Sequence, residues 1–113
     1  MLIPGDVPDI DVVKVQRTIK NEEDVLILDV RTPAEYSRGH IEGSINIPVD
    51  DIPTQAPKTI KDKNRVIYVY CLSGSRSTLA CAELLSMGYK NTKNIRSGLL
   101  AWRTEGYQLS IID

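Results

Sequence analysis

The segment Val66-Ile-Tyr-Val-Tyr-Cys-Leu-Ser-Gly-Ser-Arg-Ser77 decides the fold of this chain. It begins with an apolar run, Val66–Tyr70, that predicts a buried strand. A loop of small and polar residues, Cys71–Arg76, comes next, and a helical pattern over Ser75–Met87 ends at Gly88. The strand therefore delivers a cysteine into a short loop at the beginning of a helix.

A cysteine in this position is predicted to be reactive. The N–H groups at the start of a helix are unpaired and carry partial positive charge, so they bind anions and lower the pKa of a nearby thiol. Arg76 adds a permanent charge, and no Asp or Glu between Cys71 and Ala82 cancels it. The alternative is a buried, inert cysteine at a strand end, against which the polar loop argues. We expect a Cys71 thiolate that is open to a visiting anion.

Strand and helix patterns alternate along the rest of the chain. Strands are predicted over 25–30, 45–47 and, more weakly, 93–95; helices are predicted from an Asp11 cap to about 20, after the capping box Thr32–Glu35, and over about 52–60 and 99–105. This alternation implies right-handed crossovers and a mainly parallel sheet. Ligands bind at the carboxyl ends of such strands, where Cys71 and the segment Asp29–Arg31 fall.

Composition excludes several classes of protein. A chain of 113 residues fits one domain, and a net charge of −1 gives no general attraction to nucleic acid or to an anionic membrane. The first residues lack the pattern of a secretory signal, and no apolar run approaches the ~20 residues of a membrane span, so we expect a cytoplasmic protein. Two cysteines then predict free thiols, and one histidine without Cys-x-x-Cys spacing gives no zinc site.

Seven short motifs occur in a specific order. They are Leu28-Asp-Val-Arg31, Glu35-Tyr36, Gly39-His-Ile-Glu-Gly43, Asn46-Ile-Pro48, Cys71-x-x-Gly74-x-Arg76-Ser77, Gly88-Tyr89 and Gly98-x-x-x-Trp102. In this order and at these distances, the chain resembles a rhodanese-like domain from about Ile10 to Gly106. One departure is Ser97, which stands where many members of that family carry the first of two glycines.

The resemblance implies a fold and a site. The fold would be an α/β domain spanning 1–113, with a central, mainly parallel sheet of about five strands and helices on both faces. Cys71 would be the catalytic cysteine that accepts sulfur as a persulfide. The residues cradling and binding the substrate would be Leu72, Ser73, Gly74, Ser75, Arg76 and Ser77. The hydroxyl of Ser77 either donates to the sulfur or only caps the helix.

The resemblance also implies a function, a sulfurtransferase that moves a sulfane sulfur from thiosulfate or a similar small anion to a dithiol or a thiol protein. No cofactor is implied, and a monomer is the default. A persulfide carrier or interaction module, with little turnover of thiosulfate, is the main alternative. Phosphatases and arsenate reductases related to this family have one loop residue more than the six of Cys71–Arg76, and a catalytically dead domain would have no need of Cys71.

Five other residues receive structural interpretations. We expect Cys81 to fill the core of its helix rather than to resolve a disulfide with Cys71, because more than two helical turns separate it from the loop. Asp29 and Arg31 share a strand face and are expected to form a structural ion pair. His40 is expected to fix a turn, and Trp102 to lie in the core.

Overall fold

A computed structural model describes residues 6–112 and contains a five-stranded, wholly parallel sheet. The elements in chain order are β1 Asp9–Ile10, α1 Val12–Lys20, β2 Leu26–Asp29, α2 Pro33–Arg38, β3 Ile45–Asn46, the 3-10 turn η2 Val49–Asp51, α3 Ile52–Thr59, β4 Ile67–Tyr70, α4 Ser75–Ser86, β5 Thr92–Ile95 and α5 Gly98–Thr104. Across the sheet the strands lie in the order β1-β5-β4-β2-β3. Within the described range, no helix combines the length and the apolar character that crossing a membrane requires.

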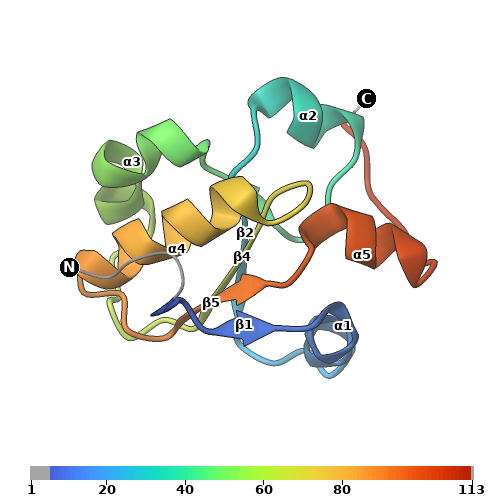
Figure 1. Ribbon diagram of the computed structural model, residues 1–113, viewed down its shortest axis with the longest axis horizontal. Helices are drawn as coiled ribbons and strands as arrows, with labels where there is room; N and C mark the ends of the chain where they lie inside the picture. The colour runs from blue at the N-terminus through green and yellow to red at the C-terminus, as the bar shows by residue number, and fades with distance from the viewer. Residues whose placement is uncertain (1–5, 113) are drawn as a thin grey trace.

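Helices cover both faces of the sheet, as expected. α3 and α4 lie on one face and α1 and α5 on the other, while α2 lies beyond the end of the strands (Figure 1). Alternate strand residues supply the two cores. Leu28 and Val69 pack toward α3 and α4, whereas Ile27 and Tyr70 pack toward α1 and α5.

The capping hydrogen bonds predicted at the starts of two helices are confirmed. The Asp11 side chain accepts a hydrogen bond from the Lys14 amide and caps α1. Thr32 and Glu35 form the reciprocal capping box of α2. These contacts satisfy amides that the helices leave unpaired, so local sequence alone fixes where both helices begin.

One strand was not predicted. β1 consists of only two residues, Asp9 and Ile10, which pair with Asn94 and Ile95 of β5. Two residues are too few to show the alternation by which a strand is recognised in a sequence. This short strand brings Asp9 beside Asn94 of β5.

The register of the sheet places the ends of several strands together. β4 lies between β2 and β5, and Asp29 at the end of β2 is the partner of Tyr70 at the end of β4. Cys71 therefore leaves the sheet at its carboxyl edge, beside the turn that follows β2. This is the edge at which open parallel sheets bind ligands.

The departure at Ser97 has a conformational cost. Ser97 has φ +58°, in the left-handed region that disfavours side chains, and it directly precedes α5. We expect Ser97→Gly to stabilise the protein by about 0.5–1 kcal/mol, because the relief of strain exceeds the extra chain entropy of glycine. Urea unfolding of the two proteins would measure the difference.

A matched control separates this effect from a general effect of glycine. Ser86→Gly changes the exposed last residue of α4, which has a helical backbone, and should destabilise the protein by up to about 0.5–1 kcal/mol. If Ser97→Gly destabilised the protein to the same extent, the strain assigned to Ser97 would be absent.

Candidate active site

Main-chain amides point at the sulfur of Cys71. The amide of Gly74 donates to Cys71 Sγ at 3.1 Å and the amide of Ser77 does so at 3.3 Å, while Ser77 Oγ lies 3.4 Å from the same sulfur. Ser77 is the third residue of α4, so one of the orphan amides of the helix start is used on the sulfur. A negatively charged sulfur in this position is stabilised by donors that are already oriented.

These contacts alter the acidity of Cys71. Burial alone would raise the pKa of the thiol, but hydrogen bonds from Ser77 and from the amides of Gly74 and Ser73 outweigh it, and the net effect is a pKa below that of an ordinary cysteine. A lowered pKa of Cys71 is also what its position at the start of α4 predicts. The loop can therefore hold a thiolate or another anionic sulfur.

Gly74 is required by the conformation of its backbone. Its φ is +117°, a conformation that residues with a side chain rarely adopt, and it serves as the N-cap of α4. Space is not the constraint, since the nearest atom to an added Cβ would be Ser97 N at 3.8 Å. Because Gly74 occupies the cap position, the interpretation of Ser77 as the helix cap is wrong.

The expectation of an open sulfur is only half right. The amides do turn inward, but Cys71 is only 1% exposed. Ser73 and Ser75 are exposed, and Leu72, Gly74 and Arg76 are half-buried, so the loop itself is the layer between the sulfur and solvent. A donor that reaches the sulfur must enter through this loop.

Arg76 does not carry an uncompensated charge, which corrects the sequence-based expectation. Its guanidinium donates to both carboxylate oxygens of Glu35, at 2.7 and 3.1 Å. This bidentate pair lowers the pKa of Glu35 to about 2, so the carboxylate stays ionised wherever the thiolate exists. The neutralising residue comes from α2, distant in sequence, which is why inspection of the loop alone missed it.

The N-terminus of α5 anchors the loop. The amide of Leu99 donates to the carbonyl of Cys71, and the amide of Leu100 donates to the carbonyl of Leu72, each at 3.0 Å. The side chain of Leu72 packs against the core shared by α1 and α5. Leu72 therefore holds the loop in place, and Figure 1 shows the loop between the start of α4 and the start of α5.

The family model of the rhodanese-like domain matches residues 12–105, which include β4, α4 and α5, the elements that hold Cys71 and its loop. The chain belongs to the rhodanese-like family. A protein named sulfurtransferase from Allochromatium vinosum is 40% identical over 100 residues, covering 88% of this chain and 92% of that protein.

Two further matches differ in length from this rhodanese-like chain. The putative sulfur carrier protein YrkF of Bacillus subtilis is 31% identical over 98 residues, which are 87% of this chain and 52% of that protein. A crystal structure of thiosulfate sulfurtransferase from Pseudomonas aeruginosa superposes with a TM-score of 0.86 at 26% identity, covering 95% of this chain and 21% of that one. The matches thus include proteins named as enzymes and one named as a carrier.

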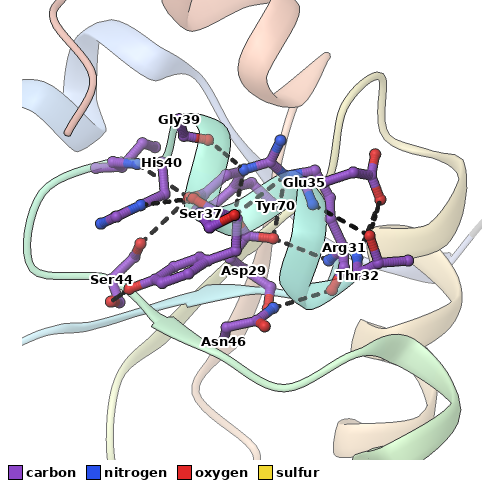
Figure 2. Close-up of polar contacts among 12 residues, drawn as sticks. Asp29, Arg31, Thr32, Glu35, Ser37, Gly39, His40, Ser44, Asn46 and Tyr70 are labelled. Carbon is purple, nitrogen blue, oxygen red and sulfur yellow. Dashed lines mark hydrogen bonds and ion pairs between the residues drawn. The ribbon is translucent and has the colours of Figure 1, made fainter. Parts of the chain in front are cut away.

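A buried ion pair supports the turn beside the loop. Arg31 donates to the Asp29 carboxylate at 2.7 Å and to the carbonyl of Gly39 at 2.6 Å, and its guanidinium lies 5.8 Å from the centre of the Tyr70 ring (Figure 2). Both charged side chains are almost fully buried. The predicted structural ion pair of this rhodanese-like fold is confirmed, and it ties β2 to the end of α2.

The remaining interpretations of single residues agree with the structure. His40 bonds through Nδ1 to the carbonyl of Tyr36 at 2.8 Å, and its ring stacks on that of Tyr36, so it fixes the turn after α2. Trp102 is 5% exposed and lies in the core. Cys81 is a fully buried free thiol, and burial raises its pKa, which makes it unreactive.

Two contacts of the sulfur environment were missed by the sequence analysis. Asn94 of β5 accepts a hydrogen bond from Ser77 Oγ at 2.6 Å and donates to Asp9 at 3.0 Å. The only signal was an asparagine inside the weakest predicted strand, an unfavourable residue there. Its placement depends on the register of β5 with β1 and β4, which the sequence does not reveal.

Proposed function

We propose that this chain is a sulfurtransferase in which Cys71 carries a sulfane sulfur from thiosulfate, or a similar small anion, to a thiol acceptor. The observation that carries the proposal is the pair of amides, Gly74 and Ser77, aimed at Cys71 Sγ. Membership of the rhodanese-like family and the named sulfurtransferase relative support it. Residues 1–113 would act as one domain, and no cofactor takes part.

In the first step the Cys71 thiolate attacks the outer sulfur of thiosulfate. A new S–S bond forms to Cys71, the S–S bond of thiosulfate breaks, and sulfite leaves with the bonding electron pair. The product is a persulfide, Cys71–S–S⁻, whose terminal sulfur takes the charge. The inward amides would stabilise that charge, as an oxyanion hole stabilises an alkoxide.

In the second step an acceptor thiolate attacks the terminal sulfur. The acceptor becomes a persulfide, and the Cys71 thiolate is released with the electron pair of the broken S–S bond. A covalent intermediate between two half-reactions predicts ping-pong kinetics. A dithiol or a thiol protein is the acceptor class, and a reducing compartment such as the cytoplasm suits two free thiols.

Intact-mass spectrometry after incubation with thiosulfate tests this proposal. The expected result is a gain of one sulfur atom, release of an equal amount of sulfite, and loss of the added mass on treatment with cyanide or a dithiol. Thiocyanate should appear when cyanide is the acceptor. An unchanged mass at saturating thiosulfate, with an intact and reduced Cys71, would exclude thiosulfate as a donor.

The second candidate function, a persulfide carrier loaded by another protein, is favoured by one observation. Arg76 is the cation at the loop, and Glu35 neutralises it through a bidentate ion pair. A neutral entrance attracts a dianion such as thiosulfate less than a free guanidinium would. A phosphatase or arsenate reductase is less favoured, because the loop is one residue shorter than theirs, and an assay with a chromogenic phosphate ester would detect it.

Substitution of Glu35 measures how much this neutralisation limits the enzyme. In Glu35→Gln the amide oxygen can still accept from Thr32 and preserve the capping box, while Arg76 loses its anionic partner. We expect kcat/KM for thiosulfate to rise about threefold to tenfold, and the gain to shrink as salt is added. Steady-state rates of thiocyanate formation at two ionic strengths measure both effects.

The variant Arg76→Ala is the matched opposite, and we expect it mainly to weaken the use of thiosulfate. Thermal melting of both variants controls for stability, since a half-exposed pair of this kind contributes about 0–1 kcal/mol. Equal activity of Glu35→Gln and the parent protein would mean that the charge of Arg76 is not what limits donor use.

A further inference from the structure

A buried polar chain leads from the candidate nucleophile to the surface. Ser77 Oγ lies 3.4 Å from Cys71 Sγ and 2.6 Å from Asn94 Oδ1, and Asn94 Nδ2 donates to Asp9 Oδ1 at 3.0 Å. Ser77 is fully buried and Asn94 is 4% exposed, so solvent does not replace these contacts. The chain joins the end of β4 to α4, β5 and β1. Asn94 and Asp9 take no part in the two steps of sulfur transfer.

The Ser77 hydroxyl has one proton and three acceptors within reach. The carbonyl of Gly74, at 3.2 Å, already accepts from the amide and the hydroxyl of Thr78, at 3.0 and 2.6 Å. The remaining acceptors are Asn94 Oδ1 and the sulfur of Cys71. When Cys71 is a thiol, the S–H donates to Ser77 Oγ and the hydroxyl donates to Asn94, so every group is satisfied.

When Cys71 ionises, these groups can no longer all have hydrogen-bond partners. A thiolate only accepts hydrogen bonds, so the Ser77 hydroxyl must turn toward the sulfur and leave Asn94 Oδ1 without a donor. If the hydroxyl stays on Asn94, its oxygen lone pairs face a negative sulfur. Either arrangement leaves a buried polar group unsatisfied, which costs free energy. Competition from Asn94 for the hydroxyl proton therefore weakens the hydrogen bond that Ser77 can donate to the anionic sulfur.

Asp9 fixes which end of the Asn94 amide faces Ser77. A carboxylate has no proton to donate, so the amide presents Nδ2 to Asp9 and Oδ1 to Ser77. The reverse orientation would let Nδ2 donate to Ser77 Oγ and free the hydroxyl proton for the sulfur, but it would oppose Oδ1 and the carboxylate. The pairing of Asp9 with Asn94 on neighbouring parallel strands keeps the two side chains at this spacing.

We propose that Asp9 is a positioning residue for Cys71: by orienting the Asn94 amide, it turns the Ser77 hydroxyl away from the sulfur and limits how strongly that sulfur is held as an anion. Only the effect of Asp9 on the persulfide rests on the proposed function. The arrangement acts on the resting thiol whatever the sulfur donor is. It would balance the fraction of thiolate against its nucleophilicity, which falls as a thiol becomes more acidic.

The test is the pKa of Cys71 in Asp9→Asn, made in a Cys81→Ala background so that one thiol alone is observed. The pKa comes from the rate of alkylation by iodoacetamide against pH, without any sulfur donor. An asparagine at position 9 can donate to a reversed Asn94 amide, so the Ser77 hydroxyl becomes free for the sulfur. We expect the pKa of Cys71 to fall by about half a unit to one unit. Asp24→Asn, which removes a highly exposed carboxylate paired only with Arg65, is the matched control and should leave the pKa unchanged.

A double-mutant cycle with Ser77→Ala separates the proposed route from simple loss of charge. If the route through the hydroxyl holds, Asp9→Asn has no effect on the pKa in the Ser77→Ala background. A downward shift that persists there and fades with added salt is a direct charge effect and overturns the proposal. Arg76, near the sulfur, and Arg96, whose Nε lies 3.5 Å from Asp9, are present in every protein of the cycle. Cys81, whose pKa is raised by burial and in part by the charge of Asp9, is absent from the Cys81→Ala background.

Asn94→Ala provides a second route to the same measurement, because it removes the competing acceptor and should also lower the pKa of Cys71. Circular dichroism before each titration shows that the variants are folded. No shift, or an upward shift, in both folded variants overturns the proposal. A failure to accept sulfur from thiosulfate would count against the proposed function and leave this titration unaffected.

Discussion

Replacing Cys71 with serine is expected to abolish sulfur transfer. A serine hydroxyl in the same loop is not ionised near neutral pH and forms no persulfide, so neither half-reaction has an intermediate. We expect turnover of thiosulfate with cyanide to fall by at least about a thousandfold, to the background rate. The fold should persist, since the amides of Gly74 and Ser77 can donate to an oxygen as well as to a sulfur.

Cys81→Ala is the matched control for this prediction. Cys81 is fully buried in the core, so its loss should reduce stability by about 1 kcal/mol and leave sulfur transfer intact. Mass spectrometry after thiosulfate treatment should show one added sulfur in Cys81→Ala and none in Cys71→Ser. Sulfur transfer that survived in Cys71→Ser, or vanished in a folded Cys81→Ala, would contradict the assignment of the nucleophile.

Adding a single methyl group at Gly98 is expected to have the second largest effect. A Cβ at this position would lie 2.3 Å from the carbonyl oxygen of Cys71 and 3.0 Å from that of Leu72, and Gly98 has φ +45°. Both obstacles are backbone atoms of the sulfur loop, so the loop must move. We expect Gly98→Ala to lose about 2–4 kcal/mol of stability and about a hundredfold in kcat/KM.

Gly106→Ala supplies the control for Gly98→Ala. Gly106 also has a left-handed backbone, φ +79°, but nothing lies within 4 Å of an added Cβ. It should lose only the conformational part, about 1–2 kcal/mol, and keep full activity. Urea unfolding and thiocyanate assays on the two variants measure the difference. Equal losses of activity in both would show that contact with the loop is not the cause.

Much of this molecule follows from local sequence. The capping box Thr32–Glu35, the Asp11 cap and the run Val66–Tyr70 each specify their element without reference to the rest of the chain. The order of strand, cysteine loop and helix predicts the amides on Cys71 for the same reason, since the donors are within six residues of the sulfur.

The rest depends on contacts between distant segments. Glu35 was recognised only as a helix cap, but its partner Arg76 is 41 residues away. Asp9 and Asn94 are 85 residues apart and meet through the pairing of a two-residue strand. The burial of Cys71 likewise depends on the loop being held against α5 by Leu99 and Leu100. Patterns of a few residues carry no information on such pairs.

The acidity of Cys71 tests most directly whether the inward amides stabilise an anionic sulfur. The measurement is the alkylation rate of Cys81→Ala against pH, so that one thiol alone is observed. The account predicts a pKa clearly below the free-thiol value of about 8.5, in line with the lowered pKa expected from the loop contacts. A pKa at or above that value in the folded protein would contradict it, because the amides of Gly74 and Ser77 would then give the sulfur no net stabilisation.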